Sequence, residues 1–419
     1  MQNKKPTNLA ALTSMRGIAA IMVVVYHYTG SFLPALQPDQ FTGLISKSYL
    51  MVDLFFILSG FIMTHVYEEA FRDRVNWQDF RGFMTARLAR IYPLHFVILV
   101  ALILLQAAKF LLHELDLGAA LGYAFGPRMG PWGLFLNLFM LQTTGLQPHP
   151  SWNGPAWSIG AEFFAYLLFP ILCLFVMRMK GYQRLLGIAA AALGLFFISH
   201  DGTDLDLTNR FGLFRCLFEF GIGVLIYRYF PQIRLRTITN DILAVTAILA
   251  VLLALHLRVD DIFMPFAFAG LVLLLASNRG AVSRTLSSRP LFRLGEISYS
   301  IYMSHFFVLR LAEVLSLSVR DSAVGSDLGV FSSLLVLVTM IALVIALSLL
   351  LHFDVERPAR NAVRRGIGEL SLFRRSEPSF SAEAARDVAE RIRAGRAGSA
   401  GSAERRGRSN EVADDVVGP

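Results

Sequence analysis

Two ionisable side chains, Arg16 and His27, lie in one apolar stretch, residues 12–33, that is long enough to cross a bilayer. Placing arginine at the centre of such a segment costs about 2.5–3.5 kcal/mol on insertion scales, so residues of this kind usually have a function. The eleven-residue step between them is roughly 16 Å on a helix and close to three turns, which puts both on nearly the same side at different depths. A histidine held beyond the membrane midplane can act as a general base.

A purely structural interpretation of the pair is also possible. Arg16 could extend to the inner interface, and His27 could belong to an aromatic belt with Tyr26 and Tyr28. That interpretation suffices for Arg16 alone. For the two residues together we favour a functional site.

Three further titratable residues are predicted to reach the depth of His27: Asp53, Glu162 and His305. A carboxylate that accepts a hydrogen bond from histidine fixes its tautomer and raises its basicity, so Asp53 or Glu162 is expected to orient His27. The alternative for either acid is a helix cap or a first-turn residue stabilised by the helix dipole. His305 could instead be a packing residue.

A pair of arginines, Arg87 and Arg90, stands three residues apart where the third apolar stretch begins. Side chains at this spacing share one helical face, and guanidinium groups bind phosphate oxygens through two hydrogen bonds. The nucleotide end of coenzyme A would suit such a site. Simple anchoring at the cytoplasmic interface is the alternative.

A second charged pair, Arg215 and Glu219, is one helical turn apart inside another apolar stretch. The two residues could neutralise each other or could hold a polar cavity open. The neighbouring Gly221 and Gly223 follow no predicted strand, so they are expected to permit close helix packing and not to bind a dinucleotide.

The composition defines the elements that must position these residues. Of the 419 residues 55% are hydrophobic and 17% charged, with a mean hydropathy of +0.53, which indicates a polytopic membrane protein of the all-α class. About ten stretches are long and apolar enough to span. They are residues 12–33, 49–66, 91–112, 157–177, 185–199, 211–229, 242–257, 262–277, 294–315 and 330–353. A shorter stretch, 132–146, is predicted to be a re-entrant or interfacial helix.

The net charge of +8 is concentrated in loops and in the C-terminal tail. This distribution follows the positive-inside rule, so it predicts both termini in the cytoplasm and gives no reason to expect nucleic-acid binding. We divide the chain into a cytoplasmic segment 1–10, a membrane domain 11–358 and a largely disordered cytoplasmic tail 359–419. Cys173 and Cys216 lie in apolar runs, so neither a disulfide framework nor a metal site is expected.

A series of strings, in order along the chain, resembles the acyltransferase family 3 of membrane O-acyltransferases, the type that acetylates exopolysaccharide or lipopolysaccharide. The strings are LTSMRGIAAIMVVVYHY (12–28), VDLFFILSGFIMT (52–64), RLARIYPLH (87–95), WSIGAEFFAYLLFP (157–170), RCLFEFGIGVLIY (215–227), LGEISYSIYMSH (294–305) and ERP (356–358). The most specific feature is the arginine and histidine separated by ten residues, followed by SGF. Gly160 and Ala161 depart from the bulkier residues expected before the intramembrane acid.

The resemblance implies an acyltransferase of the plasma (inner) membrane. It would move an acyl group, commonly acetyl from acetyl-CoA, to a hydroxyl of a sugar, glycan or secondary metabolite, with no permanently bound cofactor. His27 would then be the catalytic base, assisted by Asp53 or Glu162. Arg16, Arg87 and Arg90 would bind the phosphates of acyl-CoA, and His305, Arg215 and Glu219 would contact the acceptor. The alternative from another class is a transporter or flippase for a glycan or lipid-linked substrate, because buried charges also mark transport pathways.

Overall fold

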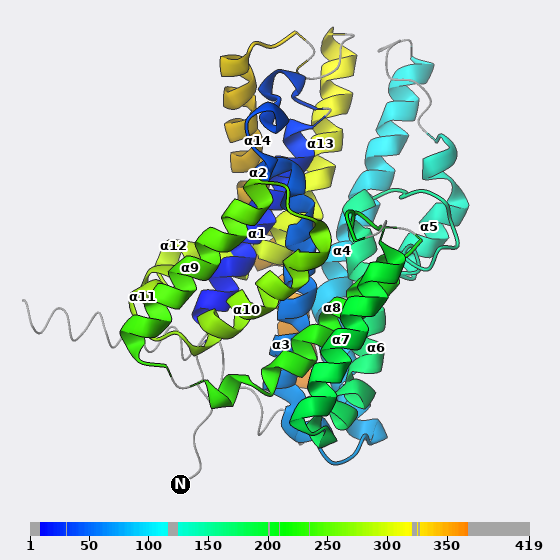
Figure 1. Ribbon diagram of the computed structural model, residues 1–419. Helices are drawn as coiled ribbons and strands as arrows, with labels where there is room; N and C mark the ends of the chain where they lie inside the picture. The colour runs from blue at the N-terminus through cyan, green and yellow to red at the C-terminus, as the bar shows by residue number, and fades with distance from the viewer. Residues whose placement is uncertain are drawn as a thin grey trace, which may run out of the picture. The chain divides into compact units, whose positions relative to one another are not determined.

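The computed structural model describes residues 9–30, 32–115, 125–199, 202–208, 210–233, 235–320, 325 and 327–367. Across this part of the chain the regular structure is helical throughout, with no strand (Figure 1). Eight helices have the length and apolar composition needed to cross a membrane. The predicted all-α polytopic bundle is therefore confirmed. The last described residues, Arg357–Ile367, form a helix, so residues 359–367 of the predicted largely disordered tail 359–419 are helical instead. Residues 1–8 and the rest of the tail, from residue 368, lie outside the described residues.

The longer helices account for all ten apolar stretches of the sequence. They are α1 (Ala10–Thr29), α3 (Met51–Phe71), α4 (Trp77–Glu114), α6 (Trp157–Arg178), α7 (Gly181–Ile198), α8 (Gly212–Tyr227), α9 (Thr237–His256), α10 (Met264–Ser277), α13 (Ser298–Arg320) and α14 (Val330–Leu351). Short helices connect them: α2 (Gly43–Ser46), α5 (Pro131–Leu138), α11 (Ala281–Leu286) and α12 (Arg289–Glu296). Another short helix, α15 (Arg357–Ile367), follows α14.

Two features bear on the predicted spans. Helices α8 and α10 have 16 and 14 residues and are shorter than a typical span, so ten crossings stay a prediction. Helix α5 has only eight residues, of which 132–138 belong to the 132–146 region, and its length of about 12 Å is too short to cross a bilayer. Helix α4 begins at Trp77, where the Asn76 side chain accepts a hydrogen bond from the Asp79 amide, so Arg87 and Arg90 lie inside a helix.

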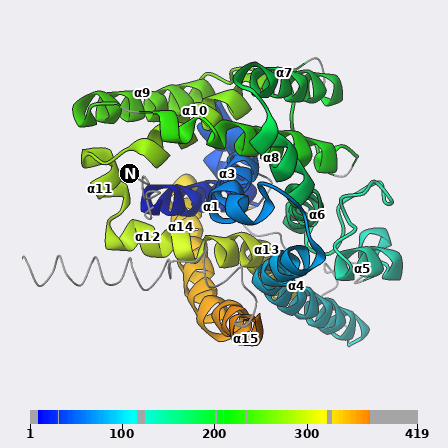
Figure 2. The same cartoon turned by 90° about the horizontal axis from the view of Figure 1, so that it is seen from below.

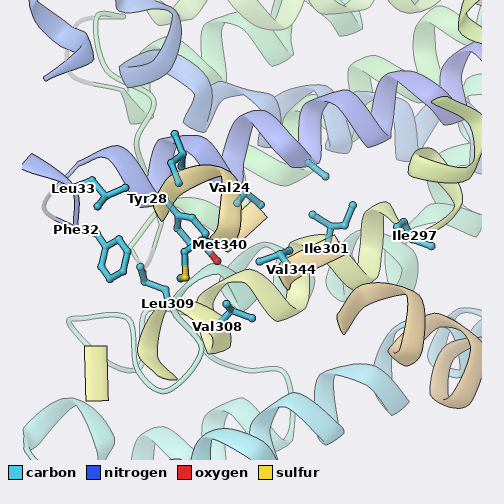
Figure 3. Packing of buried hydrophobic residues seen from close by; sticks show 12 residues of the cluster. Val24, Tyr28, Phe32, Leu33, Ile297, Ile301, Val308, Leu309, Met340 and Val344 are labelled. Atoms are coloured by element: carbon cyan, nitrogen blue, oxygen red, sulfur yellow. The ribbon is translucent and has the colours of Figure 1, made fainter. Parts of the chain in front are cut away.

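Helices α1 and α3 occupy the centre of the bundle. Viewed along the direction of Figure 2, they lie between α8 and α10 on one side and α13 and α14 on the other. An apolar cluster joins α1 to α13 and α14, with Val24, Ile301 and Val344 among its buried members (Figure 3). This packing fixes the part of α1 that carries His27 against the part of α13 that carries His305.

Helices α3 and α8 approach each other very closely at two glycines. A methyl group added at Gly60 would lie 2.1 Å from the carbonyl oxygen of Phe220, and one at Gly223 would lie 2.2 Å from that of Ile57. The prediction of close packing is confirmed for Gly223. It is wrong for Gly221, because open space surrounds that position.

Candidate active site

Two cavities lie inside the bundle and share part of their lining. The first, which we call the histidine cavity, has a volume of about 310 Å³ and is lined by His27, Arg215, Tyr26, Trp152 and others. The second, the arginine cavity, has about 70 Å³ and is lined by Arg16, Arg90, Ser59, Glu162 and others. Among the described residues, Val52 and Tyr302 alone line both cavities.

The environment of His27 defines which ring nitrogen is available for chemistry. Its Nδ1 lies 2.9 Å from the carbonyl oxygen of Val23, one turn earlier in α1. A carbonyl oxygen only accepts hydrogen bonds, so Nδ1 carries the proton in neutral imidazole and the lone pair is on Nε2. Since His27 lines the histidine cavity, this tautomer is the one a general base requires.

The second histidine, His305, packs directly against the first. The two ring centroids are 4.9 Å apart, and Tyr28 donates a hydrogen bond to the carbonyl oxygen of His305 at 2.7 Å. The Nδ1 of His305 donates to the carbonyl oxygen of Tyr302 at 2.6 Å, while its buried Nε2 has no hydrogen-bond partner among the described residues. His305 therefore packs against the ring of His27 and is not among the described residues that line either cavity.

The carboxylate expected to orient His27 has other partners. Asp53 binds Arg215, with Oδ1 2.6 Å from Nε, and Glu162 accepts hydrogen bonds from Ser59 and Tyr166. In the described part of the chain neither acid forms a hydrogen bond with His27, and the Val23 carbonyl takes the orienting role instead. The expected depth was compatible with such a bond, but depth does not specify the direction in which a side chain points.

A buried ion cluster joins α3 to α8. The Arg215 guanidinium contacts Asp53 and lies 3.7 Å from Glu219, and all three side chains are at most 1% exposed. It also lies over the ring of Trp157, 5.6 Å from the ring centroid. The predicted pairing of Arg215 with Glu219 is thus present and extended by Asp53. Of the three, Arg215 reaches the histidine cavity.

The three arginines predicted to bind phosphate do not act as one group. Arg16 and Arg90 line the arginine cavity, and Arg90 pairs with the buried Glu356 at 3.5 Å. Arg87 instead donates a hydrogen bond to the Tyr67 hydroxyl at 2.9 Å and lies over the Tyr67 ring, 5.3 Å from its centroid. The structure therefore brings Arg16 and Arg90 together in one cavity, and Arg87 is not among the described residues that line it.

Several hydroxyl residues of the site had escaped the sequence analysis. Glu162 Oε1 accepts hydrogen bonds from Ser59 at 2.5 Å and from Tyr166 at 2.6 Å. Tyr302 donates to the carbonyl oxygen of Pro155 at 2.9 Å and lies 2.8 Å from the Ser158 hydroxyl. All of these residues except Pro155 belong to the motif strings quoted above. A hydroxyl group within an otherwise apolar string could have identified them as site residues.

A buried aspartate holds the loop beside the histidine cavity. Asp261 pairs with Lys47 at 2.6 Å, accepts a hydrogen bond from the Leu205 amide at 2.9 Å, and also binds the Tyr49 hydroxyl. Residues 202–208 are thereby fixed where Asp206 lines the cavity. Loss of solvent raises the pKa of Asp206, against the opposing attraction of Arg215.

These features define a class of protein: a polytopic helical membrane protein with a histidine in one cavity and cationic groups in an adjoining cavity. The acyltransferase domain family matches residues 9–353, so the chain belongs to this acyltransferase family. The resemblance seen in the sequence is confirmed, and the transporter alternative is not favoured. Among the described residues, no group of His, Cys, Asp and Glu side chains is suited to hold a metal ion.

Curated relatives carry acetyltransferase or acyltransferase names. The chain is 24% identical to O-acetyltransferase OatA of Staphylococcus aureus over 73% of its own length and 51% of the relative. It is 25% identical to the putative peptidoglycan O-acetyltransferase YrhL of Bacillus subtilis, over 84% of this chain and 55% of the relative. It is 28% identical to acyltransferase MdmB of Streptomyces mycarofaciens, over 85% of this chain and 93% of the relative. The chain thus spans about half the length of the first two relatives. No solved structure matches it significantly.

Proposed function

We propose that this chain transfers an acyl group, principally acetyl, from acyl-CoA to a hydroxyl group of a sugar, cell-surface glycan or similar acceptor. One observation carries the proposal: a histidine with a free Nε2 and a pair of arginines line two cavities that adjoin at Val52 and Tyr302. Such an arrangement lets donor and acceptor arrive separately and meet at one point. The relative OatA is named an O-acetyltransferase and YrhL a putative peptidoglycan O-acetyltransferase, which supports O-acetylation of a glycan by this chain.

The donor would enter by the arginine cavity. Arg16 and Arg90 would hold the phosphate groups of acyl-CoA, with Arg87 nearby, and the pantetheine arm would extend past Ser59 toward Tyr302. At about 70 Å³ the cavity is too small for a complete arm, so donor binding must move the side chains that line it. The positive-inside distribution supports an entrance on the cytoplasmic face of the plasma membrane, with both termini on the same side.

The acceptor would occupy the histidine cavity, which Tyr26, Trp152 and Trp157 supply with aromatic surface. His27 Nε2 would take the proton of the acceptor hydroxyl as its oxygen attacks the thioester carbonyl. The carbon–sulfur bond then breaks, and the departing thiolate of coenzyme A takes the proton back from His27. A transient acyl group on His27 is the alternative course, with the same products.

Replacing His27 tests this mechanism. We expect His27→Ala to lower transfer by about 10²–10⁴-fold, because general acid–base catalysis is typically worth that much. The variant should still bind acyl-CoA, since the arginines line the other cavity, whereas Arg90→Ala should weaken that binding. Transfer is measured as the acyl mass increment on glycan acceptors with purified protein, and donor binding by calorimetry.

The matched control is His256→Ala, which removes an exposed histidine at the end of α9 whose partner is the Thr42 hydroxyl. This control should retain full transfer. Near-normal transfer by His27→Ala at a normal protein level would overturn the role of His27. Absence of transfer from every acyl-CoA tested with the unaltered chain would overturn the proposed function itself.

A further inference from the structure

The wall between the two cavities is built almost entirely of apolar and aromatic side chains. Phe55 and Phe56 face the arginine cavity, and Trp157 faces the histidine cavity. Edge-to-face contacts join Phe55 to Tyr302 and Phe56 to Trp157, each with ring centroids 5.9 Å apart. Val52 on α3 and Tyr302 on α13 are the two described residues that line both cavities, so a passage between the cavities would have to run between them.

The two sides of this passage differ in rigidity. The Tyr302 hydroxyl is held by the Pro155 carbonyl oxygen and by Ser158, and its ring packs on Phe55 and 5.7 Å from His305. This ring cannot turn away without losing two buried hydrogen bonds. Val52 presents two methyl groups and has no polar contact. The width of an opening at this point would therefore be set by the bulk of residue 52.

We propose that Val52 and Tyr302 form a gate that selects the length of the acyl group, an inference that rests on the proposed function. A donor whose phosphates stay at Arg16 and Arg90 advances with its acyl group first, so the acyl group is the part that meets the wall. The thioester carbonyl comes within reach of His27 only when the acyl group has entered the opening. A short group such as acetyl passes between the valine methyls and the tyrosine ring, and each added methylene must displace one of them.

The test compares acetyl-CoA, propionyl-CoA and butyryl-CoA as donors for the full chain in detergent or nanodiscs. Val52→Ala removes both methyl groups, and we expect it to raise the ratio of butyryl to acetyl kcat/KM by at least about tenfold. One methylene in a fitted pocket typically changes this ratio by about 10–200-fold. Val52→Ile adds bulk at the same place and should lower the propionyl to acetyl ratio, so the two variants move selectivity in opposite directions.

Val24→Ala is the matched control. It deletes the same two methyl groups from a buried valine that is not among the described residues lining either cavity. It should leave the donor ratio unchanged. An unchanged ratio in both Val52 variants, or an equal change in Val24→Ala, would overturn the gate.

The control and the unaltered chain separate this inference from the proposed function. If the unaltered chain transfers acetyl and the Val52 variants keep its donor preference, the gate is wrong and the proposed function stands. If the unaltered chain transfers no acyl group from any of the three donors, the proposed function fails and the gate fails with it. If Val52→Ala alone loses all transfer, Val52→Ile decides the question. The gate then requires Val52→Ile to lower the propionyl to acetyl ratio, and an unchanged ratio in Val52→Ile overturns it.

Discussion

The contact between α3 and α8 allows a quantitative prediction about Gly223. A Cβ atom at this position would lie 2.2 Å from the Ile57 carbonyl oxygen. The clashing atoms of α3 belong to its backbone and cannot rotate away as a side chain could, so the helices must separate by roughly 1 Å. Overpacking of this kind costs about 1–3 kcal/mol. Alanine also gains about 0.5–1 kcal/mol over glycine within a helix. We therefore expect Gly223→Ala to destabilise the protein.

Gly221→Ala isolates the clash from the helix propensity. Gly221 is two residues away in the same helix, and nothing lies within 4 Å of a Cβ atom there. Both variants gain the same propensity, so the difference between their free energies of unfolding is the cost of the clash, about 1–3 kcal/mol. The assay is thermal unfolding of the purified protein in one detergent at one scan rate. Equal melting temperatures for Gly223→Ala and Gly221→Ala would refute the close approach of α3 and α8.

Two further predictions concern buried charges. Arg215→Met should destabilise the protein by about 3–5 kcal/mol, because it leaves Asp53 and Glu219 buried without their cation, whereas Arg310→Met at a half-exposed pair should cost about 0–1 kcal/mol. Equal melting temperatures for the two would contradict this. Glu356→Gln should raise KM for acyl-CoA several-fold with little change in kcat, because Arg90 loses the carboxylate that fixes it. Steady-state kinetics at varied donor concentration measure this, and an unchanged KM would count against a donor role for Arg90.

The sequence predicts the helices well because hydrophobic length is a direct consequence of the bilayer. All ten apolar stretches are helical, and 132–146 contains only the short α5. Hydropathy is less informative about helix ends. Helix α4 starts fourteen residues before its apolar part, because polar residues after the Asn76 cap continue the same helix.

The sequence also separates Arg16 from His27 along one helix, but it does not give the partners of the titratable residues. The step from Arg16 to His27 places them in different cavities, as two levels on one helix should. Which way Asp53 points depends on how α3 is rotated against α8, and that rotation is fixed by tertiary contacts at Gly60 and Gly223. A sequence pattern on one helix carries no information about the neighbouring helix, so the contact with Arg215 could not be foreseen.

The buried ion cluster and the proposed gate are linked through this rotation. Asp53 and Val52 are consecutive on α3, and consecutive side chains on a helix point about 100° apart. Binding of Asp53 to Arg215 on α8 therefore directs Val52 away from α8, and Val52 lines both cavities together with Tyr302. Replacing buried ion pairs by apolar residues often leaves stability unchanged or improves it, so stability alone is a weak reason to retain three buried charges. In this protein they orient the helix that carries one of the two proposed gate residues.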